Sequence, residues 1–161
     1  MLLVVSPRSR WWFRHALRVE SVLVTAKLRA PRSTALILLD HGSRRSQANS
    51  ELEGLAARLA AVFANRYVCV EAAHMELAEP TLAQAFERCV ANGAERIVVV
   101  LFFLAAGAHA TDDIPKLAAE ASALHGNVDY LLTPPLGTHE TIADVVAAIV
   151  DETVSSALQK N

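Results

Sequence analysis

The sequence lacks any hydrophobic run long enough to cross a membrane. Hydrophobic residues make up 53% of the 161 positions, yet no stretch reaches the roughly 18 uninterrupted apolar residues that a membrane-spanning helix requires. The sequence also lacks the glycine-rich patterns that bind nucleotide phosphates and the G-x-S-x-G turn of acyl-transfer enzymes. We therefore expect no membrane insertion, no nucleotide cofactor and no serine nucleophile, although Ser43 lies near His41.

Cysteine is also scarce. The two cysteines, Cys69 and Cys89, stand 20 positions apart and form no Cys-x-x-Cys pair. This pattern is typical of a reduced, intracellular protein, and it suits neither a disulfide framework nor a zinc site. We expect both thiols to be small residues of the core.

Acidic residues are almost absent from the N-terminal part. Residues 1–33 carry seven Lys or Arg side chains and one acid, Glu20, whereas the remaining 128 residues carry eight basic and sixteen acidic side chains, a formal charge of −8. An Arg-rich, acid-poor leader is typical of an organelle targeting segment, and a translation start placed too far upstream would give the same pattern. We favour the second interpretation and treat residues 1–33 as a basic extension, disordered or wrongly included, outside the domain.

We expect a cytoplasmic protein, or a plastid one if the leader is a transit peptide. The acidic charge of the remaining residues argues against a nucleic-acid partner.

From residue 34 onward, strand and helix patterns alternate. Strands are predicted at residues 36–39, 68–72, 96–104 and 128–132. Helices are predicted to begin at Ser46, Pro80, Asp112 and His139 and to end near Ala64, Asn92, Leu124 and Leu158. Four strands that are each followed by a helix predict a parallel sheet with right-handed crossovers. We therefore expect residues 34–158 to form one small doubly wound α/β domain, with a four-stranded parallel sheet and helices on both faces.

The loops after the four predicted strands hold the candidate functional residues. In open α/β sheets, ligands bind outside the carboxyl ends of the strands. The ionisable residues of the first three loops include His41; His74, Glu76 and Glu79; and His109, Asp112 and Asp113. We expect His41, His109 and the two glutamates to converge on one crevice. Imidazole nitrogens with oxygen ligands suit a loosely held divalent metal ion such as Fe²⁺, Co²⁺ or Ni²⁺.

Some of these residues have simpler structural explanations. Asp112 and Asp113 are expected to begin a helix, and one of Glu76 and Glu79 can be a charge at a helix N-terminus. The histidines expected at the surface are His74, His125 and His139.

Four motifs together resemble a known family. They are D-H-G-S at 40–43, M-E-L-A-E-P at 75–80, F-L-x-x-G-x-H-x-x-x-D-I-P at 103–115 and P-L-G-x-H at 135–139. Over about residues 34–150 the chain looks like the small sirohydrochlorin chelatases of the CbiX/SirB type, which are class II, ATP-independent chelatases with a flavodoxin-like fold. Asp40 and the phrase "AHMELAEP" are most similar to the plastid SirB branch. The chain ends in "SSALQKN" without the cysteine-rich tail of that branch, so we expect no iron–sulfur cluster.

The resemblance implies an enzyme of siroheme or cobalamin biosynthesis. It would insert Fe²⁺ or Co²⁺, with Ni²⁺ as a further candidate, into the tetrapyrrole sirohydrochlorin. By similarity, His41 is the proton acceptor and a metal ligand, His109 is the second metal ligand, and Glu79 contacts the substrate. The residues that would lie against the macrocycle are Leu104, Ala105, Ala106, Gly107, Ala108 and His109.

The resemblance also bears on charge and assembly. The substrate of the family carries eight carboxylates, and Arg44, Arg45 and Lys116 are the cations available for them, although the two arginines can equally be a solvated helix start.

Short members of the family work as homodimers. The last helix has a wide apolar face that suits an interface, comprising Ile142, Val145, Val146, Ile149 and Val150.

Two other functions fit the same residues. One is a carrier that binds metal or tetrapyrrole without turnover, and the other is a structural half-domain that works only with a second lobe. The sequence does not distinguish iron from cobalt, because both ions accept the same ligands.

Overall fold

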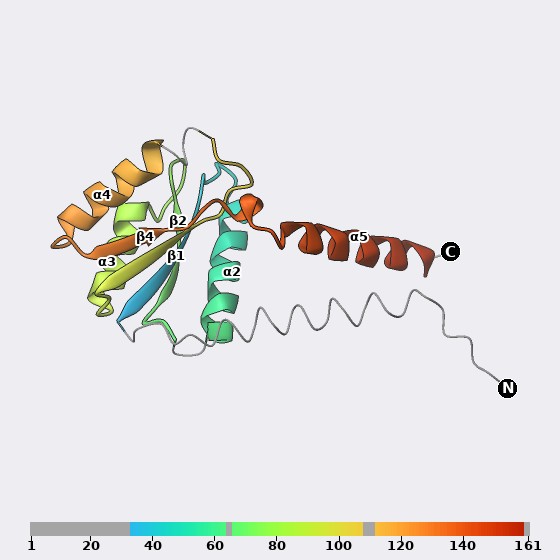
Figure 1. Ribbon diagram of the computed structural model, residues 1–161, viewed down its shortest axis with the longest axis horizontal. Coiled ribbons are helices and arrows are strands. Elements are labelled where there is room, and N and C mark those ends of the chain that lie inside the picture. Colours follow the sequence, from blue (N-terminus) through green and yellow to red (C-terminus); the bar gives the residue numbers. More distant parts are fainter. Residues whose placement is uncertain (1–32, 64–65, 108–111, 160–161) are drawn as a thin grey trace. The chain divides into compact units, whose positions relative to one another are not determined.

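The computed structural model describes residues 33–63, 66–107 and 112–159 (Figure 1). The elements follow in the order β1 (Thr34–Asp40), α2 (Ser46–Phe63), β2 (Val70–His74), α3 (Leu82–Ala91), β3 (Arg96–Leu101), α4 (Ile114–Leu124), β4 (Asp129–Leu132), the 3₁₀ helix η2 (Leu136–Thr138) and α5 (Ile142–Leu158). The predicted alternation of strands and helices is confirmed. The predicted extension, residues 1–33, lies outside the described residues apart from Ser33.

The four strands form one parallel sheet in the order β2-β1-β3-β4. Alternate residues of a strand point to opposite faces of the sheet, so the apolar side chains of β1 pack on both faces. Ile37 and Leu39 belong to the buried cluster that includes α3 and α4, whereas Leu38 packs with Leu52 and Ala56 of α2. The sheet therefore has helices on both faces, and the predicted doubly wound α/β fold is confirmed.

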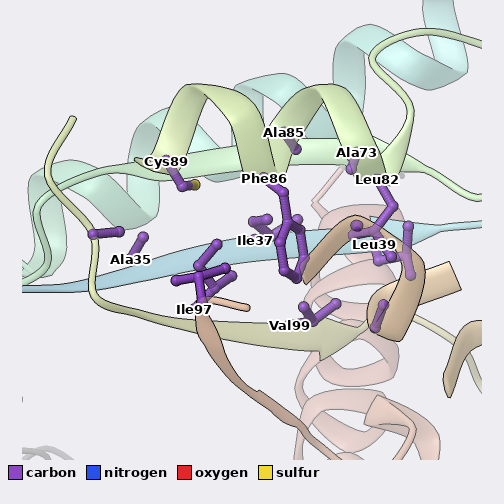
Figure 2. Close-up of a cluster of buried hydrophobic side chains, with 14 of the residues drawn as sticks. Ala35, Ile37, Leu39, Ala73, Leu82, Ala85, Phe86, Cys89, Ile97 and Val99 are labelled. Carbon is purple, nitrogen blue, oxygen red and sulfur yellow. The ribbon is translucent and has the colours of Figure 1, made fainter. Parts of the chain in front are cut away.

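The larger cluster forms the main core, between the sheet and helices α3 and α4 (Figure 2). Phe86 of α3 is fully buried, and its ring meets that of Tyr130 of β4 edge to face, with centroids 6.3 Å apart. Burying a side chain of this size stabilises the fold by about 1.5–3 kcal/mol. β1 pairs with β2 on one side and with β3 on the other, and its last residue, Asp40, directly precedes His41.

Several strand boundaries lie one to three residues from the predicted ones, and two of these shifts change the loops that carry candidate residues. β2 continues to His74, because pairing with β1 extends as far as the partners Asp40 and His74. β3 ends at Leu101 instead of residue 104, and Phe102 and Leu104 are exposed. His74 therefore belongs to a strand, and the third loop is longer than expected.

Three helix starts also differ from the prediction, because α3 and α4 each begin two residues later than expected and α5 begins three residues later. α3 begins at Leu82, not at Pro80, because the Thr81 side chain caps the helix and exchanges hydrogen bonds with Gln84. α5 begins at Ile142, after η2, and none of its residues is buried. The predicted end of α3 at Asn92-Gly93 is confirmed. No helix within the described ranges is long and apolar enough to cross a membrane.

Candidate metal and tetrapyrrole site

The candidate site is built on the carboxyl ends of β1 and β2. His41 directly follows β1, and Glu76 lies two residues after β2. The His41 Nε2 atom is 2.9 Å from the Glu76 carboxylate oxygen Oε1, and the two side chains are 43% and 51% exposed. Of the two glutamates expected to converge with His41, Glu76 lies beside it, at a place that a ligand can reach.

Backbone hydrogen bonds hold the first two loops together. The Met75 N–H donates to the Asp40 carbonyl oxygen at 2.8 Å, and the Glu76 N–H donates to the His41 carbonyl oxygen at 3.2 Å. Gly42 follows with φ +82°, and a Cβ atom there would lie 2.1 Å from the Glu76 carbonyl oxygen. Glycine at position 42 is therefore required both for its backbone conformation and for the close approach of the second loop.

His74 is buried, so its predicted place at the surface is wrong. Its side chain is 0% exposed, and its Nδ1 atom lies 2.6 Å from Asp40 Oδ1. The Nε2 atom has no hydrogen-bond partner among the residues that the structure describes. The prediction failed because the expected strand ended at Ala72, whereas pairing with β1 carries β2 two residues further, to His74.

The third loop contains the residues that are predicted to lie against a macrocycle. Leu104 is 79% exposed, and the small residues Ala105, Ala106 and Gly107 are exposed as well. Ala108 and His109 lie outside the described residues, so the expected convergence of His41 with His109 is not described.

The fourth loop packs on the third through a glycine. The Gly137 N–H donates to the Phe103 carbonyl oxygen at 2.9 Å. A Cβ atom at position 137 would lie 2.0 Å from the Leu104 carbonyl oxygen. The glycine of P-L-G-x-H thus allows η2 to support the segment that begins at Leu104.

The other acidic and histidine candidates lie at the surface or at a helix start. Glu79 is exposed, and its Oε1 atom accepts a hydrogen bond from Gln84 Nε2 at 3.5 Å. His139 is exposed, as expected, and its Nδ1 atom lies 2.9 Å from Thr141 Oγ1. Asp113 occupies the position directly before α4, in agreement with its predicted place at a helix start.

Arg44 and Arg45 stand at the N-terminal end of α2, and both are exposed. The turn that carries them is held by Ser43 and Asn49, whose amide side chain both accepts from the Ser43 N–H and donates to the Ser43 carbonyl oxygen at 2.9 Å. An open depression of about 500 Å³ adjoins this turn, and its lining residues are Arg44, Arg45, Ser46, Gln47, Ala48 and Glu51. The two arginines can thus reach an anion that enters from solvent.

The two thiols lie away from these loops. The Sγ atoms of Cys69 and Cys89 are 3.3 Å apart and share a hydrogen bond. When Cys69 ionises, the Cys89 thiol donates to it, which lowers the pKa of Cys69 and, together with burial, raises the pKa of Cys89. Cys89 is fully buried in the core, as expected, whereas Cys69 is half-buried at its edge.

His41 and Glu76 form a pair of possible metal ligands rather than a complete set. Within residues 33–63, 66–107 and 112–159, no three His, Cys, Asp or Glu side chains lie together as they would around a metal ion. A neutral imidazole nitrogen and a carboxylate oxygen suit a divalent transition metal. Such a pair leaves most coordination positions of the ion open to another ligand.

Comparison with known proteins identifies the family. The CbiX family model matches residues 35–153. The chain belongs to the CbiX family. It is 46% identical over 113 residues to a protein of Arabidopsis thaliana named chloroplastic sirohydrochlorin ferrochelatase, a match that covers 69% of this chain and 48% of the relative. It is also 43% identical over 83 residues to a sirohydrochlorin cobaltochelatase of Methanocaldococcus jannaschii, which covers 52% of this chain and 57% of the relative.

Among solved structures, the fold matches that of a CbiX protein from Marinobacter aquaeolei with a TM-score of 0.66 and 32% sequence identity. That match covers 76% of this chain and 98% of the solved one. The chain spans about half the length of the two curated relatives described above. The architecture of this CbiX-family chain therefore agrees with that of a solved family member over nearly all of that member's length.

Proposed function

We propose that this CbiX-family chain inserts Fe²⁺ or Co²⁺ into sirohydrochlorin without ATP. The observation that carries the proposal is the His41–Glu76 pair, 2.9 Å apart at the exposed carboxyl edge of the sheet. The names of the Arabidopsis and Methanocaldococcus relatives support sirohydrochlorin as the substrate and iron and cobalt as the metals. Ni²⁺ is a further candidate on ligand chemistry alone.

Metal insertion requires that two pyrrole N–H groups lose their protons while the metal ion loses bound water. His41 Nε2 and Glu76 Oε1 lie 2.9 Å apart, and a divalent cation can bind both atoms from the solvent side. His41 is the proposed proton acceptor and a metal ligand, because a neutral imidazole serves both tasks near neutral pH. Glu76 is the proposed carboxylate ligand of the metal ion, and its charge offsets that of the ion. His109 is the proposed second imidazole ligand.

The macrocycle is proposed to lie against the third loop. The exposed Leu104 and the small residues Ala105 to Gly107, continuing to Ala108, let a flat ring approach the backbone closely. Glu79, exposed on the second loop, is the proposed substrate contact. Arg44, Arg45 and Lys116 are exposed cations that can pair with the substrate carboxylates.

A homodimer is the proposed assembly. The α5 side chains Val145, Val146, Ile149, Val150 and Val154 are each more than half exposed. Exposed apolar surface of this extent marks interaction sites, and two-fold dimers are the most common homo-oligomers. A second copy would cover these valines and isoleucine and would supply a facing wall for the macrocycle.

The assay follows the absorbance of sirohydrochlorin with Fe²⁺ and Co²⁺ in separate reactions, without nucleotide, in the presence and absence of the purified protein. The proposal expects protein-dependent conversion with one or both metals. A carrier would instead bind the product tightly without accelerating its formation. No conversion with either metal would refute the proposed activity.

For the compartment, we propose the cytoplasm, with the plastid as the alternative that the name of the Arabidopsis relative supports. A fluorescent protein fused to residues 1–33 separates the two. Import into plastids with removal of the leader would show that the leader is a transit peptide, and diffuse fluorescence would support the cytoplasm.

A further inference from the structure

Asp40 and His74 form a buried link between the two strands that carry the proposed ligands. The residues are register partners at the ends of β1 and β2. Asp40 directly precedes His41, and His74 lies two residues before Glu76. The 2.6 Å contact between His74 Nδ1 and Asp40 Oδ1 therefore joins the two strands one or two residues before the His41–Glu76 pair.

The Asp40 carboxylate also shapes the turn that carries His41. Its Oδ1 atom accepts a hydrogen bond from the Gly42 N–H at 2.9 Å as well as the one from His74. The backbone of His74 is fixed too, because its N–H donates to the Pro80 carbonyl oxygen at 2.8 Å and closes the second loop. One carboxylate and one imidazole thus anchor both loops of the candidate site.

Packing alone does not account for a histidine at position 74. The side chain is completely buried, and its Nε2 atom has no partner among the described residues. A buried polar atom without a hydrogen bond opposes folding, and an apolar ring of similar size would avoid that cost. A histidine at this position is accounted for by its Nδ1 donor to Asp40.

We propose that Asp40 and His74 are positioning residues that hold His41 and Glu76 at the separation needed to receive a metal ion. This inference rests on the proposed chelatase function. Neither residue is assigned a proton transfer or a bond to the metal. Their contribution is geometric, because misplacing a reacting group by about 1 Å can cost up to about 100-fold in rate.

The test compares His74→Phe with His74→Asn. Phenylalanine keeps a ring of similar bulk without a donor, whereas the asparagine amide can donate from a place close to that of Nδ1. His74→Phe is expected to lower kcat at least about tenfold, with KM for sirohydrochlorin changed by less than about twofold, because the loss lies in positioning rather than in substrate contacts. His74→Asn is expected to recover most of kcat.

Two further variants complete the kinetic test. Asp40→Ala removes the same hydrogen bond from a side chain that is 24% exposed, so the comparison survives if His74→Phe does not fold. The double variant Asp40→Ala/His74→Phe should have a kcat no lower than that of the slower single variant, because the effects of substituting two residues that act as a unit do not add. Thr34→Val is the matched control. Thr34 Oγ1 is also buried and has no hydrogen-bond partner within the described part of the chain, but it lies at the opposite end of β1, so the kcat of this variant should be unchanged.

A second measurement uses Co²⁺ alone, through its visible absorption on binding to the protein. Weaker binding by His74→Phe, restored by His74→Asn, is expected if the pair positions the ligands. Wild-type kcat and Co²⁺ absorption in both His74→Phe and Asp40→Ala would overturn the inference while leaving the chelatase function intact. If the wild-type protein itself does not convert sirohydrochlorin, the proposed function fails, and the Co²⁺ comparison still decides whether Asp40 and His74 position the metal ligands.

Discussion

The His41 imidazole and the Glu76 carboxylate meet across two neighbouring loops, with Nε2 and Oε1 2.9 Å apart. His41→Ala is expected to abolish protein-dependent metal insertion while the melting temperature changes by only a few degrees, because the side chain is 43% exposed. Glu76→Gln keeps the shape of the side chain but removes its charge. We expect it to lower kcat/KM about 100-fold, which is the typical effect of losing one acid–base or charge-stabilising group. Glu79→Gln is the matched substitution three residues away, and it should mainly raise KM. Near-wild-type turnover by His41→Ala would rule out the proposed proton acceptor.

Gly137 tests the support of the macrocycle surface. Gly137→Ala places a Cβ atom 2.0 Å from the Leu104 carbonyl oxygen, so the third and fourth loops must separate. We expect KM for sirohydrochlorin to rise about tenfold, in line with the cost of displaced binding groups, and the melting temperature to fall. Gly54→Ala is the control, because an added Cβ meets nothing within 4 Å in α2 and should stabilise that helix by up to about 1 kcal/mol. An unchanged KM in Gly137→Ala would show that the Leu104 segment does not contact the substrate.

The contact between Cys69 and Cys89 predicts that the two thiols differ in how their alkylation depends on pH. The hydrogen bond from Cys89 lowers the pKa of Cys69, so the reactive Cys69 thiolate should persist to lower pH than that of an ordinary thiol. Alkylation by iodoacetamide, followed by mass spectrometry across pH, should label Cys69 well before the buried Cys89. Cys89→Ala removes the donor and should shift the labelling midpoint of Cys69 to higher pH, whereas Glu71→Gln should shift it lower, because the Glu71 charge raises the pKa of Cys69. A midpoint that does not move in Cys89→Ala would contradict this explanation.

The exposed face of α5 predicts the oligomeric state. Light scattering of the wild-type protein should give a mass of about 35 kDa, twice the 17.4 kDa of the chain. Ile149→Asp places a charge on the α5 face, where Ile149 is 58% exposed, and should yield the monomer. Val62→Asp on α2 is the control, since Val62 is similarly exposed at 65% and should leave the dimer intact. A wild-type protein that is active and monomeric at micromolar concentration would remove the dimer proposal.

The N-terminal extension is expected to be dispensable. A protein that lacks residues 1–33 should keep its melting temperature and its rate of metal insertion, because no apolar periodicity in that segment matches the core. Thermal unfolding and the sirohydrochlorin assay check this together. A loss of several degrees would mean that the extension packs on the domain.

The order of strands and helices could be predicted from the sequence, because it depends on local hydrophobic periodicity. The apolar run from Leu36 to Leu39 predicted a strand of a sheet with helices on both faces, and its side chains do pack on both faces. The placement of His41 at a strand tip followed in the same way, since parallel strands end at one edge of the sheet. These features require knowledge only of neighbours along the chain.

Tertiary structure alone decided the partners of the site residues. In the sequence, both Glu76 and Glu79 are candidates for the crevice, and the cross-strand register of Asp40 with His74 sets Glu76 beside His41. The same register buries His74, although the strand predicted over residues 68–72 would leave this histidine in a loop. Gly137 and Leu104 come into contact across 33 positions of sequence, a separation over which local patterns carry no information. Pairing between strands and packing between loops are non-local interactions, and they determine which of the candidate side chains become neighbours.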